Sequence, residues 1–152
     1  MITTGENIPK QQEDEVYYNN NGKLSTTRAL RDFHNKYVKN ILIQSVTKNG
    51  DTLIDLAVGK GGDMPKWIEA NLSFVLGIDI SRDNINNRFN GVCTRYLDAK
   101  KKNPNVPKGL FVAGDTSKNI RNLNAIEGEK NKQIIKAIFG EISKESAKEL
   151  GT

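Results

Sequence analysis

The stretch Asp55–Asp63, with the sequence DLAVGKGGD, determines the fold that we expect for this chain. It begins within the short apolar run Thr52–Ala57 and leads into a helical pattern, 63–71, that carries Pro65 in its first turn. Glycines at such a junction let the backbone turn sharply and let a ligand approach without interference from a Cβ atom. The stretch therefore predicts a strand, a glycine-rich loop and a helix, the unit of nucleotide-binding α/β sheets.

Two more apolar runs predict further strands of the same sheet. Phe74–Ile78 (FVLGI) ends at Asp79, and Leu110–Ala113 (LFVA) ends at Gly114-Asp115. Both runs are apolar throughout rather than at every second residue, which is typical of parallel strands that are covered on both faces. Alternation of strands with helices points to the same α/β arrangement.

Helical patterns lie on either side of these strands. Upstream, a helix begins after a cap at Ser25, Thr26 or Thr27, ends at Asn49-Gly50, and has its apolar positions at Leu30, Phe33, Tyr37, Val38, Ile41, Leu42 and Val46. Between the second and third strands, Ser81 caps one long helix whose apolar face is formed by Ile85, Phe89, Val92, Cys93, Tyr96 and Leu97. Downstream, we expect one helix with Ile126, Ile134, Ile135, Ile138 and Phe139, followed by a polar, helix-favouring stretch, 141–150.

This order of elements defines the domain organisation that we predict. Residues 1–24 form a polar lead-in, and residues 25–152 form the N-terminal portion of a doubly wound α/β domain. The strands make only about half of such a sheet, and parallel sheets are rarely that small. The chain is therefore expected to be a fragment, or to borrow the rest of its sheet from a partner.

The amino-acid composition limits which metal sites, disulfides and partners are expected. The 152 residues include one cysteine, Cys93, and one histidine, His34, so an intrachain disulfide, a cysteine-clustered zinc site and a multi-histidine metal centre are not expected. No run approaches the ~18 apolar residues of a membrane span, so we expect a soluble, intracellular protein. The net charge of +5 suits a polyanionic partner, although lysine-rich solvated helix faces produce such an excess equally well.

The glycine-rich loop does not match the common phosphate-binding motifs. In a P-loop the lysine is followed by Ser or Thr, whereas Lys60 is followed by Gly61. A dinucleotide fingerprint needs a third glycine where Met64 stands, which weakens that interpretation, and a plain tight turn remains possible. The loop by itself therefore indicates a nucleotide-type site without saying which nucleotide.

Acidic residues at the strand ends favour S-adenosylmethionine (SAM). Asp79 can accept hydrogen bonds from ribose hydroxyls, and Asp115 suits the exocyclic amine of an adenine. Asp55 and Asp63 add negative charge that favours a cationic sulfonium and repels phosphates. Aspartate at a strand end is also a common turn former, which is the simpler explanation for Asp115 taken alone.

Several segments resemble the mRNA cap guanine-N7 methyltransferases, especially those of large DNA viruses. They are DLAVGKGGDMPKW (55–67), GIDI (77–80), residues 94–101, FVAGDTSK (111–118) and LRDFHNKYVKNILI (30–43), and the resemblance runs from about Tyr17 to Asn119. It implies a Rossmann-like, class I SAM-dependent methyltransferase fold. It also implies methylation of guanine N7 in the 5′ cap, within mRNA capping and processing.

The resemblance also implies roles for single residues. Lys39 and Ala57 would contact SAM at its methionine end, with Ala57 at a loop position that is usually glycine. Gly59 would also be part of the cofactor site. Asp79 would hold the ribose and Asp115 the adenine.

His34 and Asn35 fall where the family presents polar side chains to the cap guanine. The helix carries one residue more than many members between Phe33 and Lys39, so either of the two could make the main contact. Both could also belong to a solvated helix face.

Guanine N7 carries no proton to remove, so we expect no catalytic residue and no metal: the enzyme would act by positioning and electrostatics.

The family's fourth strand, with its Gln-Phe and His-Tyr-type segment, has no match in 125–152. Leu53–Leu56 would then present an open apolar edge. This predicts that the chain is inactive alone and needs the rest of its domain.

The expected partners are capped RNA and other capping-enzyme domains or subunits, without membrane contact. The expected location is the host cytoplasm or the virion for a viral protein, or the nucleus for a cellular one. Three other functions remain open: a SAM-dependent methyltransferase acting on another substrate, a non-catalytic SAM-fold partner of a capping enzyme, and a NAD-binding oxidoreductase.

Overall fold

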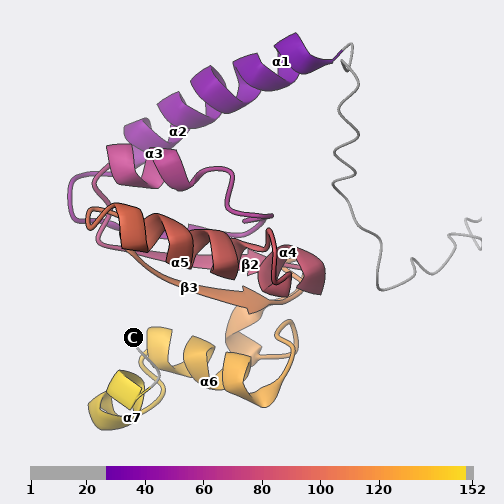
Figure 1. Ribbon diagram of the computed structural model, residues 1–152. Coiled ribbons are helices and arrows are strands. Elements are labelled where there is room, and N and C mark those ends of the chain that lie inside the picture. Colours follow the sequence, from indigo (N-terminus) through magenta and orange to yellow (C-terminus); the bar gives the residue numbers. More distant parts are fainter. Residues whose placement is uncertain (1–26, 150–152) are drawn as a thin grey trace, which may run out of the picture.

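The computed structural model describes residues 27–149, which fold around a parallel sheet (Figure 1). The strands are β1 Thr52–Asp55, β2 Phe74–Asp79 and β3 Lys108–Ala113, hydrogen-bonded in the order β1-β2-β3. Both strand pairs are parallel, as predicted. The first strand ends earlier than the run Thr52–Ala57, and the third begins earlier than Leu110.

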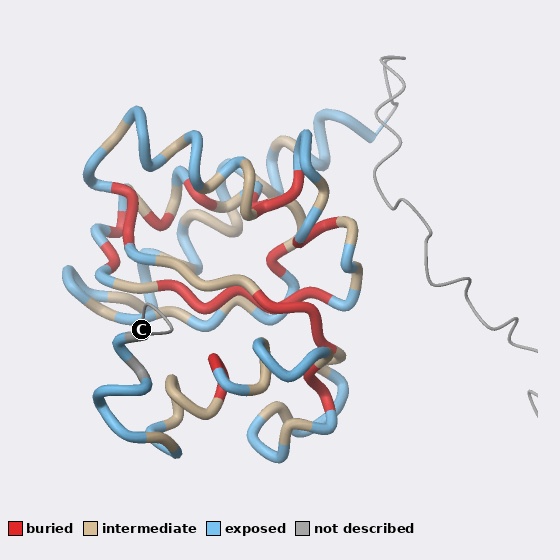
Figure 2. The backbone as a smooth tube through the Cα atoms, turned by 60° about the horizontal axis from the view of Figure 1, so that its bottom comes forward, coloured by how far each residue is buried: buried red, intermediate tan, exposed pale blue. Residues whose placement is uncertain are grey.

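Helices cover the sheet on both faces. On one side lie α3 (Met64–Glu69), α4 (Arg82–Asn86) and α5 (Val92–Lys102), and on the other lies α6 (Glu129–Ile138), followed by α7 (Lys144–Glu149) (Figure 1). The central strand supplies both cores, since Val75 packs with Trp67 and Val92 while Leu76 packs with Ile135. Figure 2 shows buried residues gathered along the sheet and on the inward sides of its helices. The predicted half of a doubly wound sheet is confirmed.

The N-terminal helix is interrupted by a turn that its apolar periodicity does not predict. It consists of α1 (Arg28–Phe33), the π-helical turn η1 (His34–Val38) and α2 (Lys39–Val46), and none of its residues is fully buried. The Thr27 side chain makes no capping hydrogen bond, and the other proposed caps, like the lead-in 1–24, lie outside the described residues. In Figure 1 α1 extends beyond the layers of the sheet.

The prediction of a single long helix after Ser81 is wrong. Ser81 Oγ does cap α4, accepting from the Asn84 amide at 3.2 Å, but the helix stops at Asn86 and α5 starts only at Val92. In the break, Asn87 Oδ1 accepts the amides of Phe89 and Asn90, which offers the backbone an alternative to helical bonds. Phe89 is therefore not part of an apolar face, and its side chain is 91% exposed.

At Gly91, the last residue of the break, the backbone passes close to that of Asn87. A Cβ atom there would lie 2.6 Å from the Asn87 nitrogen, so only glycine allows this close approach.

β1 lies at the edge of the sheet that residues 27–149 form. Leu53 packs on the core, whereas Ile54 and Leu56 are 40% and 49% exposed. An apolar strand with one unpaired side is able to accept another strand. The open edge expected at 53–56 is thus present in the described part of the chain.

Candidate functional site

The carboxyl ends of the strands bring three loops together. The amide of Val58, in the glycine-rich loop, donates to the Ile78 carbonyl at 3.1 Å, and the Gly114 amide donates to the Asp79 carbonyl at 2.9 Å. Thr116 Oγ1 donates to the Leu56 carbonyl at 3.1 Å, which joins the loop after β3 to the loop after β1. The glycine-rich loop, Asp79 and Asp115 therefore occupy one edge of the sheet, where α/β sheets bind ligands.

Asp79 is the buried centre of this edge, with 8% of its surface exposed. Its Oδ2 accepts the Gly59 amide at 2.7 Å, and its Oδ1 accepts the Ser81 amide at 2.9 Å and Asn84 Nδ2 at 3.1 Å. A carboxylate offers about four acceptor positions, so one position on Oδ2 remains for a further donor. The sequence analysis predicts Asp79 as a cofactor contact but does not identify Asn84. The only feature of Asn84 that could have indicated this role is its position in the first turn of the following helix.

The glycine-rich loop needs its glycines at two positions. Gly59 and Gly61 have φ of +54° and +72°, in the left-handed region that favours glycine. Ala57 is not among the residues with positive φ, so alanine fits where relatives were expected to have glycine. Its amide donates to Asp55 Oδ1 at 3.1 Å.

Lys39 reaches the start of α3 from the N-terminal helix. Its Nζ lies 2.9 Å from Asp63 Oδ2, while Lys66 Nζ lies 2.7 Å from Asp63 Oδ1. Burial alone would raise the pKa of Asp63, but the hydrogen bonds from Lys66 and Lys39 outweigh it and hold the pKa below its ordinary value. The predicted SAM contact Lys39 is thus fixed beside the glycine-rich loop.

Asp55 stands close to this ion pair and, among residues 27–149, forms no ion pair itself. Its Oδ1 accepts the Ala57 amide. Burial raises the pKa of Asp55 above the ordinary value, and the nearby Asp63 and Asp79 add to the increase while the Ala57 amide and Lys39 oppose it. A positive group placed here would be stabilised by the unpaired negative charge.

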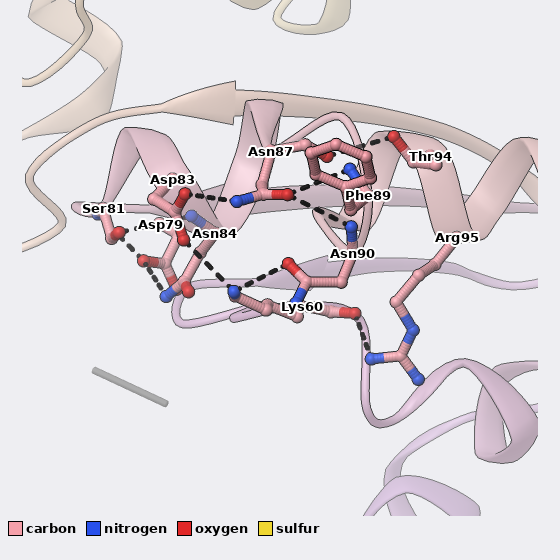
Figure 3. Close-up of polar contacts among 10 residues, drawn as sticks. All are labelled: Lys60, Asp79, Ser81, Asp83, Asn84, Asn87, Phe89, Asn90, Thr94 and Arg95. Atoms are coloured by element: carbon pink, nitrogen blue, oxygen red, sulfur yellow. Dashed lines mark hydrogen bonds and ion pairs between the residues drawn. The ribbon is translucent and has the colours of Figure 1, made fainter. Parts of the chain in front are cut away.

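Lys60 reaches Asp83 of α4 and Asn90 of the break that follows it (Figure 3). Its Nζ lies 2.8 Å from Asn90 Oδ1 and 3.1 Å from Asp83 Oδ2, and its carbonyl accepts Arg95 Nη1 at 2.7 Å. These contacts attach the glycine-rich loop to α4, α5 and the break between them. They agree with the exclusion of a P-loop, in which the lysine would face phosphates.

Asp115 occupies a more open turn. Its Oδ1 accepts the Ser117 amide at 3.0 Å and Ser117 Oγ at 2.6 Å, and its Oδ2 lies 3.1 Å from Lys118 Nζ. Hydrogen bonds from Ser117 and, with a smaller effect, from Lys118 lower the pKa of Asp115. These bonds are those of an aspartate that stabilises a turn, and the turn lies at the strand ends where a ligand could bind. The geometry therefore agrees both with a structural role and with the predicted adenine contact.

His34 and Asn35 lie on η1, on the same helix as Lys39. The Lys39 amide donates to the His34 carbonyl. Within residues 27–149 neither side chain makes a hydrogen bond or ion pair with the strand-end residues, and His34 is exposed while Asn35 is half-buried. The structure therefore brings Asp79, Asp115, Gly59, Ala57 and Lys39 together and leaves this pair at the rim.

Residues 27–149 contain neither a cluster of metal ligands nor a membrane-spanning helix. No group of three or more His, Cys, Asp or Glu side chains there could hold a metal ion. Likewise, none of the helices in 27–149 combines the length and apolar character that crossing a membrane requires.

The fold and the site define the class of this protein. A parallel sheet with a glycine-rich turn after one strand and acids after the next two is a Rossmann-like, nucleotide-binding arrangement. The sequence model of the mRNA (guanine-N(7))-methyltransferase domain matches residues 10–140, and the chain belongs to this family. The resemblance noted in the sequence is confirmed.

Individual relatives agree with this assignment. The chain is 32% identical over 105 residues to mRNA cap guanine-N(7) methyltransferase 1 of Arabidopsis thaliana, covering 64% of this chain and 28% of that protein. It is 31% identical over 100 residues to a probable mRNA-capping enzyme of Acanthamoeba polyphaga mimivirus, covering 66% of this chain and 8% of that protein. For the Saccharomyces cerevisiae mRNA cap guanine-N(7) methyltransferase the identity is 45% over 62 residues, or 41% and 14% of the two chains. The chain thus spans less than a third of these relatives.

Proposed function

We propose that this chain forms the SAM-binding side, and part of the guanine-binding side, of an enzyme that methylates N7 of the mRNA cap guanine. The observation that carries the proposal is Asp79, which is buried where three strand ends meet and is oriented by the amides of Gly59 and Ser81 and by the Asn84 side chain. Family membership supports the proposed reaction, and this geometry supports a site for the methyl donor at this edge.

The residues at this edge fit SAM. The free acceptor position on Asp79 Oδ2 suits a ribose hydroxyl, and Asp115 lies at the neighbouring strand end, within reach of an adenine on that edge. The unpaired carboxyl of Asp55, beside Asp63, suits a sulfonium cation. Lys39 has donors left beyond its bond to Asp63 for the carboxylate of the methionine end.

The proposed methyl transfer requires the protein mainly to position the methyl donor and the guanine. Bound SAM would supply an electrophilic methyl group, and guanine N7 carries a lone pair without a proton, so no general base is required. The chain's own residues bind and orient: Asp79 and Asp115 fix one end, Lys39 the other, and the glycine-rich loop lets the cofactor approach closely.

The remaining parts of the function are proposals about the whole protein. We propose that β1 pairs through its open side with a further strand of the same domain, and that this part completes the cap pocket and is needed for activity. Capped RNA is the proposed substrate, with other capping domains or subunits as partners. The proposed compartment is the host cytoplasm or virion for a viral protein and the nucleus for a cellular one.

Binding of S-adenosylhomocysteine, measured by calorimetry, tests the proposal. Asp79→Ala should lower its affinity by about 100-fold, roughly 2.7 kcal/mol, because hydrogen bonds to a buried carboxylate are lost. Asp98→Ala, which removes an exposed carboxylate 3.6 Å from Lys101 on α5, is the matched control and should bind normally. Undiminished affinity in Asp79→Ala, or binding of NAD in place of S-adenosylhomocysteine, would contradict the assignment.

A further inference from the structure

The break between α4 and α5, residues 87–91, presents an aromatic ring to solvent. Phe89 is 91% exposed, and no other large hydrophobic side chain in residues 27–149 is as exposed. A single apolar residue on a surface needs no explanation by itself. What distinguishes this ring is the way its backbone is held and the charge around it.

The backbone that carries the ring is fixed by the side chain and the carbonyl of Asn87 (Figure 3). Asn87 Oδ1 accepts the Phe89 amide at 2.9 Å and the Asn90 amide at 3.2 Å. The Asn87 carbonyl accepts the Gly91 amide at 2.9 Å and Thr94 Oγ1 at 3.1 Å. Because the backbone is already ordered and phenylalanine has few rotatable bonds, a flat ligand that covers the ring costs little conformational entropy.

The break is attached to the glycine-rich loop. Lys60 Nζ donates to Asn90 Oδ1 at 2.8 Å, and Arg95 Nη1 donates to the Lys60 carbonyl at 2.7 Å. Phe89 is thus held beside the loop that lines the proposed cofactor edge. It lies on the same face of the sheet as α3, to whose start Lys39 and the N-terminal helix are attached (Figure 1).

The helices on either side of the break are strongly basic. Residues 82–102 contain six lysines and arginines and two aspartates. Both aspartates are engaged in ion pairs, since Asp83 Oδ2 lies 3.1 Å from Lys60 Nζ and Asp98 Oδ1 lies 3.6 Å from Lys101 Nζ. A region with this excess of positive charge attracts polyanions.

Two arginines of this region have no carboxylate partner among residues 27–149. Arg88 is exposed and forms no ion pair there, and the Arg95 guanidinium bonds to a carbonyl, which leaves its charge uncompensated. Along the chain the neighbours of the ring, Arg88 and Asn90, are exposed and polar. Cations beside an exposed ring are the combination with which proteins bind single-stranded nucleic acids, whereas protein-docking sites need a larger apolar patch.

We propose that Phe89 stacks on a base of the transcript just downstream of the cap, with Arg88 and Arg95 contacting its phosphates. The inference rests on the proposed function, because it adds a contact for the RNA body to a site for the cap guanine. Every base has a π-face, so the contact does not depend on sequence, and stacking on one aromatic side chain raises affinity about 10-fold or more. The protein then distinguishes capped RNA from the free cap dinucleotide, which lacks the downstream bases.

Affinities for a capped RNA of about ten nucleotides and for the dinucleotide GpppA test this, measured in the complete protein that carries this chain with S-adenosylhomocysteine present. Phe89→Ala should weaken binding of the capped RNA about 10-fold and leave the affinities for GpppA and S-adenosylhomocysteine unchanged. Leu97→Ala, which removes another exposed apolar side chain, on α5, is the matched control and should bind the RNA normally.

Two further substitutions of Phe89 separate stacking from a general apolar contact. Phe89→Trp should retain the affinity for capped RNA, since an aromatic face remains. Phe89→Leu should lose as much affinity as Phe89→Ala, because leucine is apolar but has no π-face.

The salt dependence of binding tests the phosphate contacts. Arg88→Ala should reduce the slope of log affinity for the capped RNA against log salt concentration by about 0.7, the value for one phosphate contact on a single strand. Phe89→Ala should leave this slope unchanged, because a stacked ring releases no counterion.

Other results would overturn the inference. Capped RNA that the unaltered protein binds no more tightly than GpppA would do so and leave the proposed function standing. Full RNA affinity in Phe89→Ala would do so in favour of a protein contact at this break, and full affinity in Phe89→Leu would reject stacking. If the unaltered protein binds neither GpppA nor capped RNA, the proposed function and the inference both fail.

Discussion

Two regions carry the residues proposed to act, and they are built differently. At the strand ends, Asp79 is buried and its oxygens accept three N–H groups, and the glycine-rich loop is bonded to both neighbouring loops. The N-terminal helix has no fully buried residue and is held to the body through Lys39 and Ile43. Residues 27–149 thus organise the proposed cofactor edge by themselves, whereas the proposed guanine edge lies on a helix with few contacts to the rest of the described chain.

The core beneath the strand ends should be the most sensitive part of the molecule. Trp67 is 1% exposed and stacks on Phe111 with ring centres 6.3 Å apart. Trp67→Ala should lower the free energy of unfolding by about 3–5 kcal/mol, because a large core side chain is removed and a cavity remains. Urea unfolding measures this, with the exposed Phe89→Ala as control; a loss below about 1 kcal/mol would contradict the packing.

A smaller effect is expected in the glycine-rich loop. Gly61→Ala places a Cβ atom 2.8 Å from Val92 Cγ2 at a φ of +72°, whereas Gly62→Ala meets nothing within 4 Å. The first substitution should cost about 1–3 kcal/mol of stability and the second less than about 1 kcal/mol. Thermal unfolding of the two variants provides the comparison, and equal losses would show that the loop is not packed as described.

The ion pair that joins the two regions should make stability depend on pH. The pKa of Asp63 is lowered, so its contribution is present above the unfolded value of 3.8 and is lost as the pH falls through the lower, folded pKa. Asp63→Asn should therefore cost about 1–2 kcal/mol at pH 7 and progressively less below about pH 4.

Asp55 provides a control of opposite sign for this pH dependence. Its pKa is raised, so its ionisation destabilises the fold as the pH rises through that value. Asp55→Asn should be neutral or stabilising at pH 7 in the same urea titrations. Two variants with the same pH profile would argue against these environments.

The smallest effect is expected on the outward side of the N-terminal helix. Tyr37 and Leu30 are 60% and 70% exposed, so Tyr37→Ala and Leu30→Ala should change the stability of this chain by no more than about 0.5 kcal/mol. Chemical denaturation of the isolated chain is the appropriate measurement. A loss above about 1 kcal/mol would mean that this side is covered and that the two regions differ less than described.

Much of the strand-end region could be predicted from sequence. Continuous apolar runs identify parallel strands, and the acid after each run must then lie at one edge, which placed Asp79 and Asp115 correctly beside the glycine-rich loop. What could not be predicted are contacts set by tertiary structure. Lys39 and Asp63 are 24 positions apart, and no local pattern indicates that they pair.

Two of the errors in the predicted helices have local causes. Apolar spacing continues from Ile85 through Phe89 to Val92, but the side chain of Asn87 competes for the backbone amides and ends α4. In the N-terminal helix, an apolar stripe at helical spacing is compatible with both an α and a π turn, because one added residue shifts the phase without removing the pattern. Periodicity detects that a helix forms and says little about its exact winding.

The bond between Gly59 and Asp79 makes one backbone amide a natural probe of this protein. The Gly59 N–H donates at 2.7 Å to the buried carboxylate whose remaining acceptor position lies on the same oxygen. A ligand hydroxyl that binds this oxygen changes the electron density at the acceptor, and thereby the NMR frequency and the solvent-exchange rate of that amide. A single glycine signal, followed by titration, would therefore report when the cofactor edge is filled.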